Sequence, residues 1–225
     1  MLCIDAARIN YDLLLESAPK GELADVRLYL AEELPNVWLN AYVAIMPHEH
    51  NVQRIEVDGF EYLWDLSSNL VSQDIVPASE AVGDRLVSAH GLSRQNVADR
   101  NDSRLKGRTL GPISVMDSSS CSTFDRGHAI GHALGGRLDL NILPQTRSVN
   151  RGGNWRRMER FCQLNPGTYF FCRPLYVGLS AHPAEIEFGI LRSDGSLWVE
   201  SFKNYKNMAE LESIERLYRE RIHSF

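Results

Sequence analysis

The sequence predicts an α+β fold in which helices flank a mainly antiparallel sheet. Apolar residues recur at helical spacing in two stretches, 22–34 and 207–222. Elsewhere apolar and polar residues alternate, and two such stretches contain an Asp-Gly pair, at 58–59 and at 194–195. Asp-Gly between alternating stretches is typical of β-hairpins, and hairpins make antiparallel neighbours. These observations indicate a sheet built from hairpins, with helices packed against it.

The first hundred residues are expected to form an α/β region. The elements predicted here are helices over 4–18 and 22–34, a strand over 37–46 and a hairpin over 52–66. Pro35 is expected to end the second helix, because proline inside a helix removes a hydrogen bond. His48 and His50 form a His-Glu-His sequence that could ligate a metal, but such a pair is more often a polar turn, which is the preferred interpretation here after Pro47.

The rest of the chain alternates between the same two kinds of element. The predictions are a helix over 79–98, a polar loop over 99–122 with a short strand near 113–116, a strand over 167–179, a hairpin over 186–202 and a helix over 207–222. We place a boundary near residue 100, between an accessory region (1–100) and a second domain (101–225). A single sheet that crosses this boundary is an equal alternative.

Composition describes an ordinary globular protein of 225 residues, with 44% hydrophobic and 24% charged residues. No apolar run approaches the roughly 18 residues needed to span a bilayer, and no basic segment precedes an apolar run at the N-terminus. We therefore expect no membrane interaction. The expected location is the cytoplasm, or outside the cell after export that uses no signal peptide. Four cysteines without CxxC spacing argue against a zinc ribbon or a redox motif, and free thiols are expected. A Cys162–Cys172 disulfide is possible only if the protein is exported.

Charge is distributed very unevenly along the chain, although the formal net charge is only −5. Residues 1–99 carry 6 Lys and Arg against 16 Asp and Glu, whereas residues 100–160 carry 11 against 5. A local basic surface can attract a polyanion because salt screens charges beyond about 10 Å. The central segment is thus compatible with phosphate binding. The acidic half is expected to dock on a partner or to shield the site.

The central stretch, residues 123–160, holds most of the residues that could do chemistry. His128 and His132 form an HxxxH pair, which on a helix would place two imidazoles for zinc. Glycines at 127, 131, 135 and 136 disfavour a helix across this interval, and no glutamate follows the first histidine. A zinc-protease site is therefore not predicted.

Read as a whole, this stretch resembles the DNA/RNA non-specific endonucleases of the ββα-metal (His-Me finger) superfamily, which include secreted bacterial nucleases and nuclease toxin domains. The elements that carry the resemblance are DRGH at 125–128, a Gly-Gly pair at 135–136, NILPQT at 141–146, Asn150 and Glu159. The resemblance covers about residues 120–205. It implies a ββα-metal nuclease core within the α+β fold.

The resemblance also implies a role for each matching residue. His128 would be the general base that takes a proton from the attacking water, which suits a side chain that titrates near neutral pH. Asn150 would be the direct protein ligand of Mg²⁺, for which Mn²⁺ can substitute. Asn141 would orient the groups around the metal, and Glu159 would hold metal-bound water. Arg126 would contact the phosphate through its guanidinium fork.

Further arginines are expected to bind the nucleic-acid backbone without reading its sequence. They are Arg147, Arg151, Arg156 and Arg157, the last two on a helix predicted over 154–163. The expected activity is Mg²⁺-dependent hydrolysis of DNA, with RNA as a second substrate. The expected biological role is a bacterial effector toxin with an immunity or inhibitor protein as partner. The alternatives are a cytoplasmic defence or turnover nuclease, and a catalytically silent binding module with the same fold.

Overall fold

A six-stranded antiparallel sheet forms the centre of the computed structural model, which describes residues 3–45, 50–66, 84–95, 124–136, 140–177, 182–205 and 209. In spatial order its strands are β1 (Val52–Val57), β2 (Phe60–Asp65), β3 (Arg85–Leu92), β6 (Tyr169–Leu175), β7 (Glu185–Leu191) and β8 (Leu197–Lys203). Every neighbouring pair is antiparallel. The predicted α+β class is confirmed.

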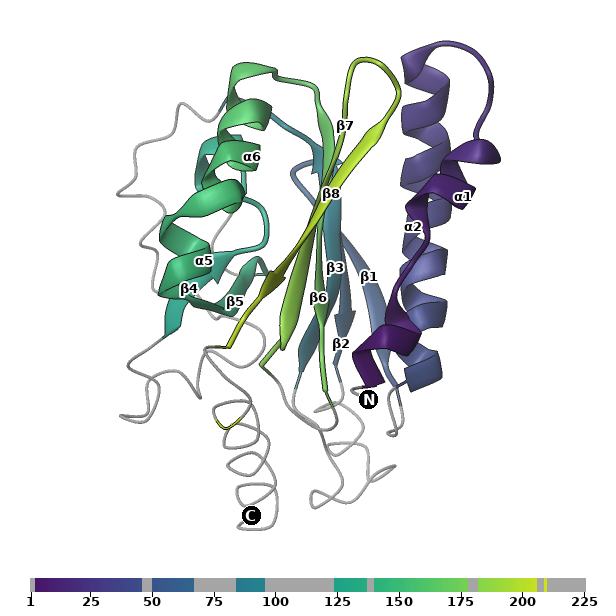
Figure 1. Ribbon diagram of the computed structural model, residues 1–225. Helices are drawn as coiled ribbons and strands as arrows, with labels where there is room; N and C mark the ends of the chain where they lie inside the picture. Colours follow the sequence, from purple (N-terminus) through teal and green to yellow (C-terminus); the bar gives the residue numbers. More distant parts are fainter. Residues whose placement is uncertain are drawn as a thin grey trace.

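Helices cover the sheet on both faces (Figure 1). One face carries η1 (Cys3–Ala7), α1 (Tyr11–Glu16) and α2 (Leu23–Ile45). The other carries a two-stranded ribbon, β4 (Phe124–His128) and β5 (Ile142–Thr146), with η4 (His132–Leu134), α5 (Arg147–Arg151) and α6 (Gly153–Leu164). The acidic N-terminal helices and the central motif stretch therefore lie on opposite sides of the sheet.

Strand β6 contributes side chains to the hydrophobic cores on both faces of the sheet. Its side chains alternate in direction, so Phe170 and Cys172 join the core under α6, whereas Tyr169 and Phe171 join the core under α2. All seven of its residues are buried. A strand that is covered on both faces has a nearly continuous run of apolar residues. The sequence of β6 therefore does not show the alternation of apolar and polar residues that marks a half-exposed strand.

Both predicted hairpins are present. The first turns at Asp58 and Gly59, whose φ angles of 54° and 71° are the positive values that two-residue hairpin turns require. The second joins β7 to β8, with Leu191 paired to Leu197 across a turn that contains Gly195 at a φ of 82°. Glycine accepts these angles without the steric cost that other residues incur.

Two predicted elements are wrong. Of the strand predicted over 37–46, residues 37–45 are helical instead, because α2 continues through Pro35 to Ile45. Burial of Leu34, Trp38 and Tyr42 against the sheet offsets the hydrogen bond that proline removes. The helix predicted over 79–98 is also wrong where the structure describes it. Residues 85–92 form β3, an interior strand whose apolar residues need not alternate.

Other predictions are only partly tested by the structure. The helix over 4–18 is divided into η1 and α1. The short strand near 113–116, the helix over 207–222 and His48 lie outside the described residues, apart from helical residue 209. β3 pairs with β6, so one sheet crosses the boundary expected near residue 100. Within the described part of the chain, no helix is long and apolar enough to cross a membrane.

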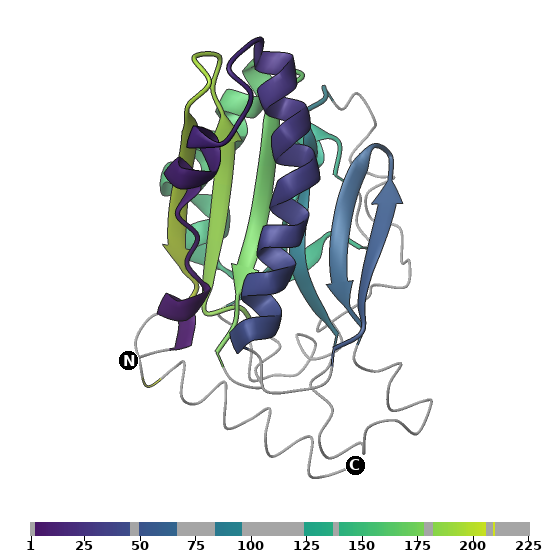
Figure 2. The ribbon, with the colours of Figure 1, turned by 90° about the vertical axis from the view of Figure 1, so that its right-hand side faces the viewer.

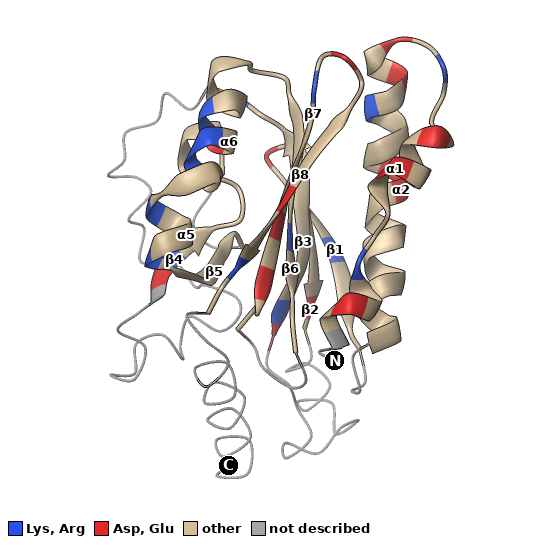
Figure 3. Cartoon of the chain, viewed as in Figure 1, with Lys and Arg blue, Asp and Glu red and all other residues tan. Residues whose placement is uncertain are grey.

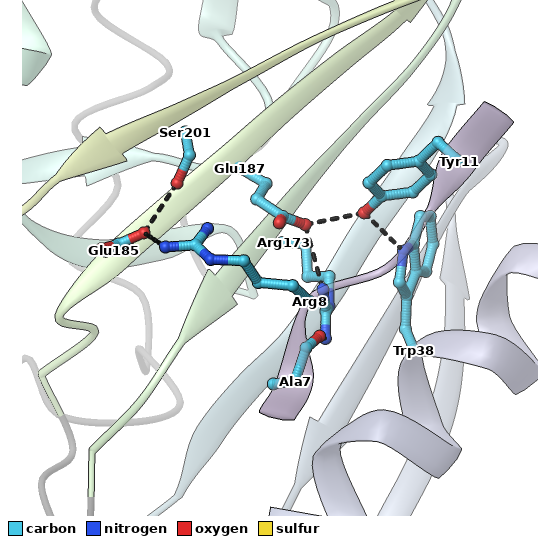
Figure 4. A network of polar contacts seen from close by, with 8 residues as sticks. All are labelled: Ala7, Arg8, Tyr11, Trp38, Arg173, Glu185, Glu187 and Ser201. Carbon is cyan, nitrogen blue, oxygen red and sulfur yellow. Dashed lines mark hydrogen bonds and ion pairs between the residues drawn. The ribbon is translucent and has the colours of Figure 1, made fainter. Parts of the chain in front are cut away.

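A buried polar network fixes the N-terminal segment to the sheet (Figure 4). Arg173 on β6, only 2% exposed, donates to Glu187 Oε2 at 3.0 Å and to the Ala7 carbonyl oxygen at 2.7 Å. The Tyr11 hydroxyl donates to the same Glu187 oxygen at 2.7 Å. Buried charges are stable only when paired and hydrogen-bonded, so this network fixes the N-terminal segment to strands that lie 166 and 176 residues later in the chain.

Replacing Arg173 by alanine is expected to lower the free energy of unfolding by about 3–5 kcal/mol, because Glu187 would remain buried without its counter-ion. Arg8 offers a matched control, since it pairs with Glu185 at 3.0 Å but is 43% exposed. Arg8→Ala is expected to cost less than about 1 kcal/mol. Urea denaturation followed by circular dichroism measures both. Equal losses would contradict a special role for the buried pair.

The thiols of Cys162 and Cys172 are free and buried. Burial raises the pKa of Cys162 to about 12, and it raises that of Cys172 further. Because the thiolate is the reactive form, a disulfide reagent at pH 8 is expected to leave both cysteines unmodified in the folded protein and to modify them in urea. Mass spectrometry of the labelled peptides reports this, and native modification at either position would contradict it.

Candidate active site

The two sequence motifs of the central stretch pair with each other as the strands of one ribbon. Asp125 to His128 form most of β4, and the NILPQT residues after Asn141 form β5. Asp125 lies opposite Gln145, and His128 lies opposite Ile142. His128 ends its strand and His132 begins a separate 3-10 turn, so the helix that an HxxxH zinc site needs is absent, as the glycines predicted.

Helix α5 follows β5 directly and places Asn150 beside the first residue of the DRGH motif. Asn150 Nδ2 donates to Asp125 Oδ2 at 3.1 Å. Arg151 Nε and Nη2 donate to the two oxygens of the same carboxylate at 2.6 and 2.9 Å, and Arg147 Nε lies 3.4 Å from it. Asp125 therefore joins β4 to three residues of α5, over a sequence separation of more than twenty residues.

The ionisation of Asp125 reflects this arrangement. Burial opposes the charged form, but the hydrogen bonds from Arg151 and Asn150 and the nearby guanidinium charges outweigh it, so the pKa of Asp125 lies below its ordinary value. The carboxylate is thus a permanent acceptor at neutral pH. It accepts a hydrogen bond from Nδ2 of the Asn150 amide. The other end of that amide, Asn150 Oδ1, makes no hydrogen bond among the described residues.

Asn141 stabilises the loop that follows His128. Its Oδ1 accepts from the Ile130 amide at 2.7 Å, and its Nδ2 donates to the Ile130 carbonyl oxygen at 2.6 Å. The side chain is fully buried. A Cβ atom on Gly136 would overlap both the Ile130 carbonyl and the Asn141 amide, which explains a glycine at this position. Asn141 thus holds the backbone two residues after His128 through both ends of its amide.

Glu159 on α6 faces the same loop from the other side. A Cβ atom on Gly131 would lie 2.7 Å from Glu159 Oε1, so this approach of the carboxylate depends on glycine. Burial raises the pKa of Glu159 although Arg156 donates to it at 2.7 Å. The structure therefore places a largely buried carboxylate beside Gly131, in the backbone segment that follows His128.

The arginines expected to bind nucleic acid line α5 and α6, where Figure 3 shows basic residues gathered. Arg147 and Arg151 lie at Asp125, Arg156 pairs with Glu159, and Arg157 Nη1 donates to Asn154 Oδ1 at 3.1 Å. Their side chains are exposed, as is Arg126 on β4. Arg147, Arg151, Arg156 and Arg157 thus each lie next to an acceptor of the protein itself.

Two residues of this region were missed by sequence reasoning. Asp125 belongs to the DRGH motif but has no predicted role of its own, although the Arg147–Arg151 spacing of one helical turn could have indicated a shared acid. Gln145 is fully buried, and neither end of its amide has a hydrogen-bond partner among the described residues. Its side chain packs directly on Gly127, which explains the glycine in DRGH. No pattern in the sequence indicated this contact.

Replacing Asp125 by alanine is expected to lower activity about 10- to 100-fold and to raise the Mg²⁺ concentration needed for half-maximal cleavage, because Asn150 would lose its orienting acceptor. Asp125→Asn keeps an acceptor but no charge, so an intermediate loss is expected. Asp194, an exposed carboxylate on the β7–β8 turn whose pKa is also lowered, provides the control. Equal effects of Asp125→Ala and Asp194→Ala would contradict the positioning role.

The candidate ligand for a metal ion at this site is a single amide oxygen, Asn150 Oδ1, and not a cluster of side chains. Within the described ranges, no group of three or more His, Cys, Asp and Glu residues could hold a metal ion. The free Oδ1 of Asn150 instead fits a hydrated ion that takes one protein ligand. Magnesium binds in this way, because it retains several water molecules in protein sites.

Comparison with known proteins shows that this region is similar to one family. Residues 84–188 match the family described as DNA/RNA non-specific endonuclease. No curated protein matches the sequence. Solved structures that match include the Sda1 nuclease with a bound zinc ion, at 19% identity over 70% of this chain and 75% of that one, with a TM-score of 0.33. An extracellular endonuclease matches at 13% identity over 72% and 81%, and an extracellular nuclease at 14% over 70% and 86%, both with a TM-score of 0.34.

Proposed function

Because residues 84–188 of this chain match the DNA/RNA non-specific endonuclease family, we propose that it is a Mg²⁺-dependent nuclease that cleaves DNA and RNA within the strand. The observation that carries the proposal is the Asp125 carboxylate, which holds Asn150 and Arg151 next to the DRGH strand. One carboxylate thereby gathers an amide oxygen for a cation and a guanidinium for a phosphate at a single place.

Asn150 is proposed to hold the metal through Oδ1, with Glu159 accepting a hydrogen bond from water around it. When bound, Mg²⁺ would offset the charge that develops on the phosphate and on the leaving oxygen. Asp125 contributes by fixing the amide, since donation from Nδ2 directs Oδ1 away from the carboxylate. The buried position of Glu159 strengthens its hydrogen bonds, because the local dielectric is low.

His128 is proposed to take the proton from the attacking water. The imidazole is half-buried at the end of β4, where Asn141 holds the next residues through both ends of its amide. This support matters because proton transfer in the transition state requires the base within hydrogen-bond reach of the water. Gly127 and Gln145 pack together immediately before His128 and restrict the strand further.

Substrate is proposed to bind through its phosphates, with Arg126, Arg147, Arg151, Arg156 and Arg157 as the contacting side chains. Contacts to the backbone carry no sequence information, so binding would be non-specific and would weaken steeply with salt. Arg151 is paired with Asp125, and Arg156 is paired with Glu159. A bound phosphate would therefore share each guanidinium group with a carboxylate of the protein.

The direct test is cleavage of a supercoiled plasmid and of a folded RNA by the purified chain. Nicked and linear products are expected with Mg²⁺ or Mn²⁺, and none with EDTA. Cleavage of circular plasmid distinguishes an endonuclease from an exonuclease, because a circle has no ends. Intact plasmid and intact RNA in both metals would contradict the proposal.

The proposed biological role is a bacterial effector toxin that an immunity protein neutralises. An active non-specific nuclease would destroy the nucleic acid of any cell that contains it. Induced expression inside bacteria is therefore expected to arrest growth and degrade the chromosome, whereas a His128→Ala variant is tolerated. Growth that continues while the chain retains activity in vitro would favour the alternative of a defence or turnover nuclease.

A further inference from the structure

Helix α6 has a buried face and an outer face that faces solvent. It buries three side chains against the core, which are Trp155, Met158 and Cys162. Arg157, Arg160 and Leu164 each follow one of these buried residues by two positions, which is about half a helical turn. All three side chains are exposed, and together they form the outer face of α6. The face carries charge as far as Arg160 and ends in the uncharged Leu164.

The positive charge of the outer face is not neutralised by a carboxylate. Helices α5 and α6 together contain five arginines and one glutamate, a net charge of +4. That glutamate, Glu159, pairs with Arg156 at 2.7 Å. Arg157 and Arg160 form no ion pair within the described ranges, and Arg160 Nη1 donates to the neutral Oε1 of Gln163 at 3.0 Å. This amide orients the guanidinium group of Arg160 without offsetting its charge.

The elements around α6 leave this charge in place. The β7–β8 hairpin contacts α6 through Trp198, whose ring centroid lies 6.4 Å from that of Phe161. Residues 192–203 of the hairpin contain two basic and two acidic residues, so they add no net charge. On the opposite side of the sheet, α2 contains three acidic residues and one arginine. The unneutralised positive charge therefore belongs to the side of the sheet that carries the candidate active site.

We propose that the outer face of α6 binds the phosphate backbone of a nucleic-acid duplex on one side of the cleaved bond. Arg160 is the contact furthest from that bond, and Gln163 is the residue that positions it. This inference rests on the proposed function and adds these two residues to it. In Figure 1, α6 leads away from β4 and β5, so Arg160 lies beyond the candidate active site.

The chemistry of the outer face fits a duplex better than a single strand. Proteins that bind single strands hold the bases on aromatic side chains. The aromatic residues of α6, Trp155 and Phe161, pack against the core and do not belong to the outer face. A duplex carries about one negative charge per 1.7 Å of its axis, so guanidinium groups alone can bind it. A guanidinium group that is not paired with a carboxylate can offer its full fork to a phosphate.

The probe is a fluorescently labelled DNA duplex, whose binding to the full chain is measured by anisotropy in EDTA so that no cleavage occurs. Arg160→Gln is expected to weaken binding about 3- to 10-fold and to lower the slope of log affinity against log salt by about 0.9, the value for one lost phosphate contact. Binding of a single strand is expected to weaken less than about twofold. Arg54→Gln is the matched control, because Arg54 is 52% exposed on β1, at the far edge of the sheet (Figure 2).

Variants of Gln163 separate charge from position. Gln163→Glu would pair Arg160 with a carboxylate, as Glu159 already pairs Arg156, and is expected to weaken duplex binding about as much as Arg160→Gln. Gln53→Glu adds the same charge on β1 and is its control, with less than about a twofold change expected. Gln163→Met removes the amide but no charge. It is expected to weaken binding about two- to threefold with an unchanged salt slope, because Arg160 loses its preferred orientation.

Equal losses for Arg160→Gln and Arg54→Gln, or for Gln163→Glu and Gln53→Glu, would overturn the proposal, because they would indicate net charge alone. Equal losses for duplex and single strand would overturn the preference for a duplex. Competition by polyglutamate as strong as by unlabelled duplex would assign the face to an acidic protein.

Cleavage measurements separate this proposal from the nuclease proposal. Arg160→Gln is expected to raise KM for a duplex with kcat unchanged, because a contact away from the cleaved bond stabilises bound substrate and transition state alike. A chain that binds duplex through Arg160 but cleaves nothing with Mg²⁺ would contradict the nuclease proposal alone. A chain that cleaves DNA and binds duplex equally well after Arg160→Gln would contradict the role of α6 alone.

Discussion

Replacing His128 by alanine is expected to lower kcat for plasmid cleavage by about 100- to 10,000-fold, which is the usual contribution of a positioned general base. The fold should remain, because His128 ends a strand whose register is set by pairing along β5 and by the burial of Gln145 against Gly127. Steady-state cleavage of a fluorescent duplex measures kcat and KM separately. We expect KM to change little, since phosphate binding depends on the arginines.

Two further measurements separate a catalytic His128 from a structural one. Added imidazole is expected to restore part of the activity of His128→Ala, because a small base can occupy the space left by the side chain. His132, four residues later in a separate 3-10 turn, is the matched control, and His132→Ala is expected to retain most of the activity. A variant at His128 that unfolds, or that imidazole does not rescue, would indicate a structural role.

Replacing Asn150 by alanine is expected to reduce activity at least about 100-fold, because a metal that neutralises the phosphate contributes several kcal/mol to the transition state. The loss should include a higher Mg²⁺ requirement and weaker binding of Mn²⁺ measured by electron paramagnetic resonance. Asn154, a nearby asparagine whose Oδ1 accepts from Arg157, supplies the control at Asn154→Ala. Unchanged Mn²⁺ binding by Asn150→Ala would contradict its role as a ligand.

Asn150→Asp separates the two functions of the amide. A carboxylate is a stronger ligand for Mg²⁺ than an amide, so metal binding alone predicts retained activity. Asp125, however, accepts a hydrogen bond from Asn150 Nδ2 at 3.1 Å, and a second carboxylate there would repel it. We therefore expect Asn150→Asp to lose activity about as severely as Asn150→Ala. Activity near that of the wild type would show that the contact with Asp125 is dispensable.

The sequence by itself determined the parts of this protein that depend on local order. The Asp-Gly turns predicted both hairpins, because positive φ angles are a property of the turn residues themselves. Glycines around His132 excluded a helical zinc site. Helix α6 was also correctly predicted, with Trp155, Met158 and Cys162 on its buried face. Each of these features is fixed by residues within a few positions of one another.

Tertiary structure decided what local order leaves open. Pro35 lies inside α2, and residues 85–92 are a strand, because burial against the sheet outweighs propensity and periodicity. The contact between Asp125 and Asn150 joins residues 25 positions apart, so it exists only once β4 has paired with β5 and α5 has turned back. The sheet likewise separates acidic helices from basic ones, which no net charge could reveal. The sequence supplied the chemical groups, and the path of the chain placed them within hydrogen-bonding distance.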